Sequence, residues 1–185
     1  MTKAELRHKI RKLKADYSEE FPKWSEAICR KVINHPLWQE NNTVLLYHAL
    51  ADEPQLATLL QHALNEGKLV LLPVVEDDHL ILRRYEGVAS LREGAFHIME
   101  PIGETFPRER YDEIGLVIVP GMAFDRDGHR LGRGKGYYDK LLPMLPNAKK
   151  WGICFPFQLF DSIPFESHDV LMDCVLCVVC PHWLL

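Results

Sequence analysis

The chain has 185 residues, with 22 Lys and Arg against 26 Asp and Glu, so its formal net charge is -4 at pH 7. Hydrophobic residues make up 47% and charged residues 26%, a globular composition that excludes collagen-like, coiled-coil and disordered chains. Since the surface as a whole is mildly acidic, any phosphate binding must come from a local cluster of cations. The length predicts a single domain over residues 1–185.

We expect no membrane-spanning segment and a cytoplasmic location. The longest apolar run, residues 69–75, is far shorter than the roughly 20 residues that cross a bilayer. The first residues form a charged amphipathic pattern with no apolar signal core. The five cysteines are an odd number that cannot all pair, which indicates reduced thiols.

The N-terminal part of the chain is predicted to be helical. Thr2 followed by Glu5 fits a capping box, and apolar residues then recur at helical spacing, which predicts a helix over about residues 3–16. Ser18 is the expected cap of a second helix that ends before the His-Pro pair at 35–36. Its predicted buried stripe is Phe21, Trp24, Ile28 and Val32.

The middle of the chain alternates strand and helix patterns. Residues 43–47 predict a strand, residues 54–66 predict a helix that ends before Gly67, and residues 68–75 predict the next strand. This order indicates two parallel strands joined by a right-handed crossover. Residues 80–84 predict a further strand after a turn.

The C-terminal part predicts further strands and one helix. Residues 114–120 are the most strand-like run, and a glycine-rich loop separates them from a helix over about residues 136–145. Strands are expected near residues 151–154 and 174–179. The predicted fold class is α/β, with three layers: a mostly parallel central sheet and helices on both of its faces.

The glycine-rich loop is the most informative segment. In open α/β sheets, the loop between a buried strand and the next helix lies at the carboxyl edge of the sheet, where ligands bind. Glycines let the backbone approach a ligand closely, and alternating cations suit a phosphate, as do the N–H groups at a helix start. The loop contains Gly132, Gly134 and Gly136, which alternate with Arg133 and Lys135, and Arg130 lies just before them.

This loop matches neither familiar nucleotide fingerprint. The phosphate loop of nucleotide hydrolases would need glycine at His129 and a hydroxyl residue at Gly136. The dinucleotide fingerprint would need Gly or Ala at Tyr137. A tight structural turn is the alternative interpretation, and the alternating cations make it the weaker one.

The run of residues 130–139, preceded by residues 120–125, closely resembles the signature of the 5-formyltetrahydrofolate cyclo-ligase family, also called methenyltetrahydrofolate synthetases. Further matches are a Lys-x-x-x-Arg start, an acidic pair after the first strand, a mid-chain Glu-Pro and a late His-Asp. The resemblance implies the ATP-dependent conversion of 5-formyltetrahydrofolate to 5,10-methenyltetrahydrofolate, with release of ADP and phosphate and with Mg²⁺ as cofactor. In the implied mechanism the formyl oxygen attacks the γ-phosphate of ATP, and a folate nitrogen then closes the ring.

By resemblance, Arg133 and Lys135 are the catalytic cations, since phosphoryl transfer needs positive charge around the moving group. Lys3 and Arg7 lie one helical turn apart at the edge of the apolar stripe, which could aim both cations into a cleft. A solvated basic helix is the alternative, and spacing alone favours it. The implied ATP-binding residues are Lys3, Ala4, Glu5, Leu6, Arg7, Arg130, Leu131, Gly132, Arg133, Gly134, Lys135, Gly136, Tyr137 and Tyr138.

The resemblance also implies a folate site after the first predicted strand. A carboxylate there suits the pterin, whose amino and ring N–H groups form two parallel donors. Asp52 is the rival of Glu53, and the acidic pair could also be a plain helix N-terminus; Phe96 could equally be a core residue. The implied substrate-binding residues are His48, Glu53, Phe96, Arg133, Gly134, Lys135, Gly136 and Tyr137.

For Mg²⁺, the resemblance implies Asp139 and Asp169, with Asp173 as the alternative to Asp169. Carboxylate oxygens are the ligands that Mg²⁺ usually takes from proteins, together with phosphate and water. Alternatively, Asp139 is an acidic residue near the start of a helix, where the positive end of the helix dipole favours a carboxylate.

The C-terminal cysteines invite a zinc interpretation that we consider the weaker one. Three cysteines and a histidine lie close in sequence, but residues three apart on a strand point to opposite faces. Buried core thiols are the better explanation. The residues concerned are Cys174, Cys177, Cys180 and His182.

A function from another class remains open, namely a non-catalytic module that binds a phosphorylated metabolite or an RNA backbone. The net negative charge disfavours RNA binding, which needs clustered cations and aromatic platforms. We therefore expect a folate substrate, no nucleic-acid partner and a monomeric chain.

Overall fold

The computed structural model describes residues 1–94 and 98–178. Its centre is a seven-stranded sheet in which β12, β10, β7, β1 and β2 pair in parallel, whereas β3 and β6 add antiparallel strands at one edge. This confirms a mostly parallel sheet. In sheet order, the strands are β12 (Cys174–Cys177), β10 (Lys149–Cys154), β7 (Leu116–Val119), β1 (Thr43–Leu45), β2 (Leu69–Glu76), β3 (His79–Arg84) and β6 (Thr105–Phe106).

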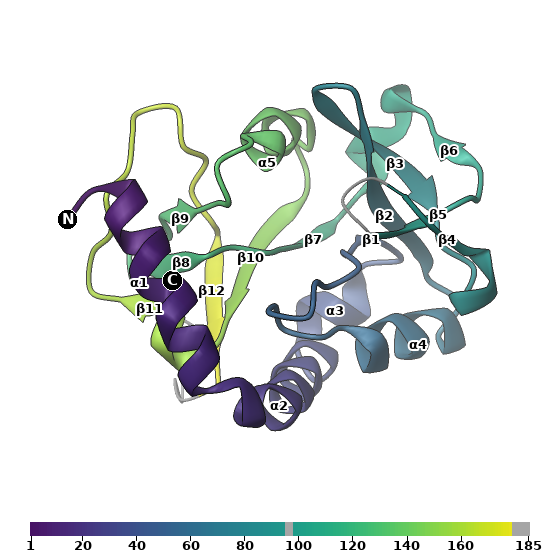
Figure 1. The fold of residues 1–185 in the computed structure, drawn as a ribbon. Coiled ribbons are helices and arrows are strands. Elements are labelled where there is room, and N and C mark those ends of the chain that lie inside the picture. Colours follow the sequence, from purple (N-terminus) through teal and green to yellow (C-terminus); the bar gives the residue numbers. More distant parts are fainter. Residues whose placement is uncertain (95–97, 179–185) are drawn as a thin grey trace.

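Helices cover both faces of this sheet (Figure 1). One layer packs on alternate strand residues such as Val44 and Ile118, and the other packs on their neighbours Leu45 and Val117. Because side chains alternate across a strand, these two sets form two cores, one on each side of the sheet. The first layer comprises α2 (Phe21–Ile33), α3 (Pro36–Glu40) and α4 (Ala57–Asn65), and the second comprises η4 (Arg108–Glu113), α5 (Tyr137–Leu141) and η5 (Leu142–Met144).

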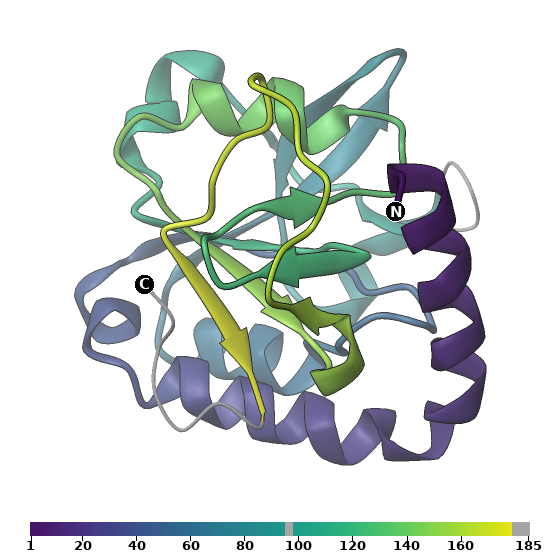
Figure 2. The same cartoon turned by 90° about the vertical axis from the view of Figure 1, so that its left-hand side faces the viewer.

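A second, three-stranded sheet lies beside the first and carries α1. Its strands are so short that the sequence shows no periodicity, and none of them is predicted. In Figure 2, α1 stands against this part of the molecule, and Leu6 and Ile10 pack on Met122, Leu131 and Ile163. The elements are α1 (Lys3–Asp16), β11 (Leu159–Phe160), β8 (Ala123–Asp125) and β9 (Arg130–Leu131), with η6 (Pro156–Gln158) before β11.

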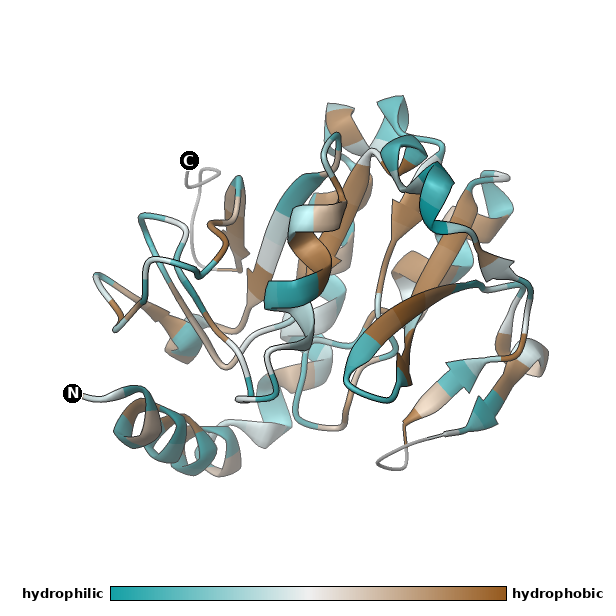
Figure 3. Ribbon diagram, turned by 90° about the horizontal axis from the view of Figure 1, so that it is seen from above, coloured by the Kyte–Doolittle hydropathy of each residue, from teal (hydrophilic) through white to brown (hydrophobic). Residues whose placement is uncertain are grey.

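A two-stranded hairpin completes the described structure. It pairs β4 (Leu91–Glu93) with β5 (Met99–Pro101) and follows the short turn η2 (Val88–Ser90). Coloured by hydropathy, the central strands are the most apolar part of the chain, while α1 is largely hydrophilic (Figure 3). In the described parts of the chain, no helix reaches the length and apolar character that crossing a bilayer requires.

The structure confirms the first predicted helix and corrects the start of the second. Glu5 N donates to Thr2 Oγ1 (3.2 Å) and Thr2 N donates to Glu5 Oε2 (2.8 Å), which completes the capping box. Ser18 is not a helix cap; it begins the 3-10 turn η1 (Ser18–Glu20) and its hydroxyl donates to the Ala15 carbonyl (3.4 Å). The helix α2 begins only at Phe21.

The helix predicted over residues 54–66 starts later than expected. α4 begins at Ala57, because the loop before it is held by other bonds. The Tyr47 hydroxyl donates to the Pro54 carbonyl (3.0 Å), and the Gln55 side-chain amide donates to the Leu50 carbonyl (2.7 Å). The acidic pair 52–53 therefore lies in a loop, and its interpretation as a helix N-terminus is wrong.

The core interpretation of the C-terminal cysteines holds for the two that the structure describes. Cys174 packs in the core under α2 and α4, whereas Cys177 packs in the core on the opposite face. Burial raises the pKa of the Cys174 thiol to about 12, so it is a poor metal-binding thiolate at neutral pH. Cys180 and His182 lie outside the described residues.

Candidate active site

The glycine-rich loop leaves β9 and enters α5 beside the N-terminal end of α1 (Figure 2). Gly134 has φ +107° and Gly136 has φ +71°, backbone conformations that a residue with a Cβ rarely adopts. Arg7 Nε donates to the Gly132 carbonyl (2.9 Å), and the Arg7 guanidinium lies 3.7 Å from where a Cβ on Gly134 would be. The N-terminal part of α1 therefore contacts the loop directly through Arg7.

Arg133 links this loop to the acidic pair after β1. Its Nε donates to Glu53 Oε1 (2.9 Å), and its Nη2 contacts Asp52 Oδ1. Glu53 is buried and also accepts a bond from the Leu50 backbone N–H (3.1 Å at Oε2). The buried carboxylate is thus fixed by one charged and one neutral donor, which a buried charge requires.

A cavity of about 370 Å³ opens at this link. Five predicted substrate residues lie on its wall: His48, Glu53, Arg133, Lys135 and Tyr137. Burial lowers the pKa of His48, so its imidazole is neutral at physiological pH. Gly134 and Gly136 give the loop its path and are not among the described wall residues. Phe96 lies outside the described residues.

The sequence reasoning missed most of the cavity wall. Residues such as Val75 and Leu80 have the same apolar character as core residues, so no sequence signal sets them apart. Glu100 belongs to the mid-chain Glu-Pro, and Pro120 and Gly121 belong to the run before the signature, so the family resemblance was the available signal for these three. Tyr138 also lines the cavity, although it is expected at the ATP site. The wall residues that were not predicted are Tyr47, Leu50, Pro73, Val75, Leu80, Ile98, Glu100, Pro120 and Gly121.

The predicted nucleotide and metal residues meet in two ion pairs. Lys3 Nζ lies 2.8 Å from Asp169 Oδ2, and Arg130 Nη2 lies 2.7 Å from Asp139 Oδ1. Burial opposes the charge of Lys3, but its bonds to Asp169 and Glu166 outweigh this and raise its pKa. Asp173 lies elsewhere, where it accepts the Lys150 backbone N–H (2.8 Å).

Arg130 is almost fully buried, and its Nε has no hydrogen-bond partner among the described residues. Its guanidinium carbon lies 5.4 Å from the centre of the Tyr138 ring. A Cβ on Gly132 would lie only 3.1 Å from Arg130 Nη1, so a side chain there would crowd the guanidinium. A buried donor without a partner fits a ligand with acceptor oxygens, such as a phosphate.

Among the described residues, one group of three side chains has metal-ligand spacing, and it does not include Asp139 or Asp169. It consists of Asp125, Asp127 and His129. The buried Asp125 carboxylate already accepts the backbone N–H groups of Asp127 (3.1 Å), His129 (2.9 Å) and Ile163 (3.1 Å). These hydrogen bonds give Asp125 a structural role, because they hold the turn between β8 and β9 in place.

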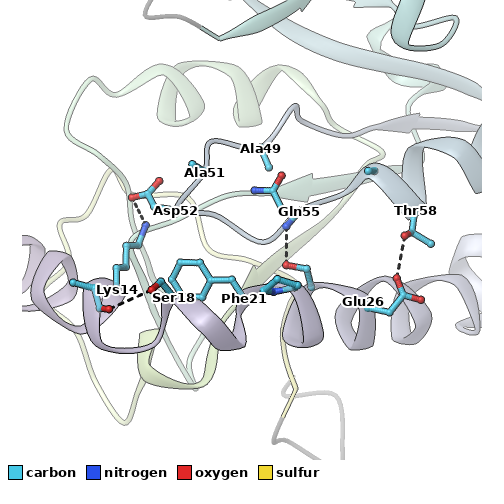
Figure 4. Close-up of a pocket in the computed structure, with 13 residues that line it drawn as sticks. Lys14, Ser18, Phe21, Glu26, Ala49, Ala51, Asp52, Gln55 and Thr58 are labelled. Atoms are coloured by element: carbon cyan, nitrogen blue, oxygen red, sulfur yellow. Dashed lines mark hydrogen bonds and ion pairs between the residues drawn. The ribbon is translucent and has the colours of Figure 1, made fainter.

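A more open hollow of about 870 Å³ lies between the end of α1, α2 and the loop before α4 (Figure 4). Several polar groups on its wall are paired within the protein: Lys14 Nζ with Asp52 Oδ2 (2.8 Å), Gln55 N with Ser25 Oγ (3.0 Å), and Thr58 Oγ1 with Glu26 Oε2 (3.0 Å). Asp52 therefore lies between Lys14 and Arg133. Burial lowers the pKa of Lys14, a residue that the sequence analysis did not single out.

The chain is similar to known proteins over nearly its whole length. The chain is 31% identical to the mouse (Mus musculus) protein named 5-formyltetrahydrofolate cyclo-ligase, over 94% of this chain and 90% of the relative. The solved structure of the Aquifex aeolicus 5,10-methenyltetrahydrofolate synthetase superposes with a TM-score of 0.87 at 35% identity, covering 100% of this chain and 93% of that one. The Mycoplasma pneumoniae synthetase structure gives a TM-score of 0.74 at 26% identity, with coverage of 95% and 98%.

The family model also matches nearly the full length of the chain. It describes the 5-formyltetrahydrofolate cyclo-ligase family and aligns with residues 1–178, which include both ion pairs and the described wall of the cavity. On this match, and on the similarity to the mouse protein, the chain belongs to the 5-formyltetrahydrofolate cyclo-ligase family.

Proposed function

We propose that this chain converts 5-formyltetrahydrofolate to 5,10-methenyltetrahydrofolate and hydrolyses ATP to ADP and phosphate. The observation that best supports this function is the hydrogen bond from Arg133 to the buried Glu53, which joins the glycine-rich loop to the cavity. A phosphate-binding loop and a heterocycle-sized cavity with a buried carboxylate are the two parts that this reaction needs. In this structure the loop and the cavity adjoin, since Arg133 and Lys135 of the loop line the cavity.

The cavity is the proposed folate site. Its apolar wall, with Val75, Leu80 and Ile98, suits a flat heterocycle, and the Glu53 carboxylate suits the paired N–H donors of a pterin. Glu53 is favoured over Asp52, because Glu53 is buried and lines the cavity whereas Asp52 lines the open hollow with Lys14. The neutral His48 contributes a polar edge to the wall.

The N-terminal part of α1 and the glycine-rich loop form the proposed ATP site. The Nε of Arg130, which has no hydrogen-bond partner among the described residues, and the cations Lys3, Arg7 and Lys135 fit phosphate oxygens. In the reaction, the formyl oxygen forms a bond to the γ-phosphorus while the bond to ADP breaks. The folate N10 then attacks the formyl carbon and loses its proton, and the bond between the formyl carbon and oxygen breaks as phosphate leaves with that oxygen. Arg133 and Lys135 lie where they can stabilise the charge that develops during the transfer.

Two carboxylates fit a Mg²⁺ ion that accompanies the nucleotide. Asp139 and Asp169 each present oxygens beside a cation that we assign to phosphate, and hard oxygen ligands suit Mg²⁺. When bound, the ion would offset phosphate charge. The protein contributes the ion pairs of Asp139 with Arg130 and of Asp169 with Lys3, which hold both carboxylates in place before the nucleotide binds.

The activity is tested by mixing the purified chain with 5-formyltetrahydrofolate, ATP and Mg²⁺. We expect the near-ultraviolet absorbance of the methenyl product to rise and one ADP to form per product. Reactions that omit ATP or Mg²⁺ should show no rise. If the complete mixture forms neither product nor ADP, the proposed function is wrong.

We further propose that the chain acts as a monomeric single domain in the cytoplasm and binds no nucleic acid. The net charge of -4 disfavours an extended RNA backbone as a ligand, because RNA binding needs clustered cations. Tight, strongly salt-dependent RNA binding without ATP hydrolysis would instead favour a binding module.

A further inference from the structure

The hydroxyl of Tyr138 is a buried polar group on the cavity wall. It has no hydrogen-bond partner among the residues that the structure describes, although nearly all buried hydroxyls have one. The neighbouring wall tyrosine, Tyr47, is different because its hydroxyl already donates to the Pro54 carbonyl (3.0 Å). A ligand in the cavity is therefore the expected partner of Tyr138.

Tyr138 lies at the border between the two proposed ligands. Tyr138 lines the cavity together with Glu53 and His48, and its hydroxyl is buried there without a partner among the described residues. Its ring contacts the guanidinium of Arg130, which belongs to the nucleotide side. The described wall of the cavity includes neither Arg130 nor Asp139. The hydroxyl is thus placed to contact the folate, although the resemblance assigns this residue to ATP.

The protonation state of the Tyr138 hydroxyl determines which kind of ligand atom this hydroxyl can bind. Burial raises the pKa of Tyr138, and the nearby Glu53 carboxylate raises it further, so the hydroxyl is a neutral donor at physiological pH. Glu53 offers acceptor oxygens and Tyr138 offers a donor, and both residues line the same cavity. The two side chains together are complementary to a ligand edge that carries N–H donors followed by an oxygen acceptor.

The amide edge of a pterin has this order: the 2-amino group, the N3–H and the C4 carbonyl. We propose that the Tyr138 hydroxyl donates a hydrogen bond to the C4 carbonyl oxygen of the bound folate while Glu53 accepts from the neighbouring N–H groups. This orientation rests on the proposed function. Since N5 is attached to the ring carbon next to C4, it also directs the 5-formyl group toward Tyr138 and the Arg130 side.

The test is a calorimetric titration of the full-length protein without nucleotide. For Tyr138→Phe, which removes no hydrogen bond within the described protein, we expect the Kd of 5-formyltetrahydrofolate to rise by about fivefold or more, with the Kd of ATP unchanged. Tyr111→Phe is the matched control, because Tyr111 is the buried tyrosine of η4 and not a described residue of the cavity wall. It should leave both constants unchanged.

A reduced folate analogue with an amino group in place of the C4 oxygen tests the contact itself. The wild type should prefer the C4-oxo compound, and Tyr138→Phe should lose about fivefold of that preference. An unchanged Kd and preference in Tyr138→Phe would overturn the inference, as would an equal loss of folate and ATP binding. If the wild-type protein binds no 5-formyltetrahydrofolate at all, the proposed function itself fails.

Discussion

Arg133 and Glu53, 80 residues apart in sequence, meet at 2.9 Å between Nε and Oε1. Arg133 is about two-fifths exposed, whereas the Glu53 side chain is 8% exposed, so the bond reaches from the loop surface into the cavity. Burial opposes the charge on Arg133, but Glu53 and Asp52 outweigh this and raise the pKa of the guanidinium further. The loop is thereby held against the cavity by a permanent charge.

Glu53→Gln tests the carboxylate of the folate site. The amide can accept fewer N–H bonds and presents a donor to the pterin, so we expect the KM for 5-formyltetrahydrofolate to rise by about 30-fold, equivalent to about 2 kcal/mol. Steady-state kinetics with saturating ATP measures this. Asp52→Asn is the matched comparison and should change the KM far less, because Asp52 lines the open hollow. A larger effect at Asp52 would reverse the assignment.

Lys135→Ala tests the cation of the glycine-rich loop. Removing a charge that stabilises the transferring phosphoryl group should lower kcat by about 10²- to 10³-fold, with little change in the melting temperature. Lys140→Ala is the control, since Lys140 lies on α5 and pairs with Asp78 (2.7 Å) away from the cavity. Near-native turnover of Lys135→Ala would remove this residue from the mechanism.

Gly134→Ala tests the conformation of the loop. At φ +107° an alanine is strained by about 1–3 kcal/mol, and relief of that strain would displace the neighbouring Arg133 and Lys135. We expect a lower melting temperature and a kcat/KM reduced at least tenfold. Gly67→Ala controls for strain alone, because Gly67 also has a positive φ (+74°) but follows α4, away from the site. It should lose stability and keep its activity per folded molecule.

Asp139→Asn tests the pairing with Arg130. The substitution leaves a nearly buried guanidinium with a weaker partner, which we expect to cost about 2 kcal/mol of stability because the pair is only partly exposed. It should also raise the Mg²⁺ concentration needed for half-maximal rate by about tenfold. Asp112→Asn, on the exposed η4, should change neither quantity. An unchanged Mg²⁺ requirement in Asp139→Asn would argue against its metal role.

The pH dependence of stability should reflect Asp52. Burial by itself would raise the pKa of Asp52, but its bonds to Lys14 and Arg133 outweigh burial and lower it. A carboxyl whose folded pKa lies below its unfolded value of about 3.9 adds stability above that value and loses it as the pH falls through the folded pKa. Thermal melts between pH 7 and pH 3 should therefore show a shallower acid decline for Asp52→Asn, which starts from a lower stability at neutral pH. An equally steep decline in the variant would contradict this.

Local sequence patterns predicted the helices and strands whose buried residues recur at regular spacing along the chain. The capping box and stripe of α1 predicted its bounds, and the apolar runs of β2, β7 and β10 predicted strands at the observed places. They did not predict β8, β9 and β11, because strands of two or three residues are stabilised by their neighbours and not by their own composition. The start of α4 was predicted too early for a related reason, since side-chain bonds to a loop are not visible as a period.

By itself, the sequence determined the fold class, the family resemblance and the chemistry of the glycine-rich loop, because these depend on residue type and spacing along the chain. Only the tertiary structure decided which carboxylate meets Arg133, that Lys14 shares Asp52, and that Tyr138 lines the cavity with a buried hydroxyl that has no partner in the described part of the chain. Such contacts join residues tens of positions apart, and many side chains of the right type compete for each one. Burial and distance select among them, and both exist only once the sheet, α1 and the loop have packed together.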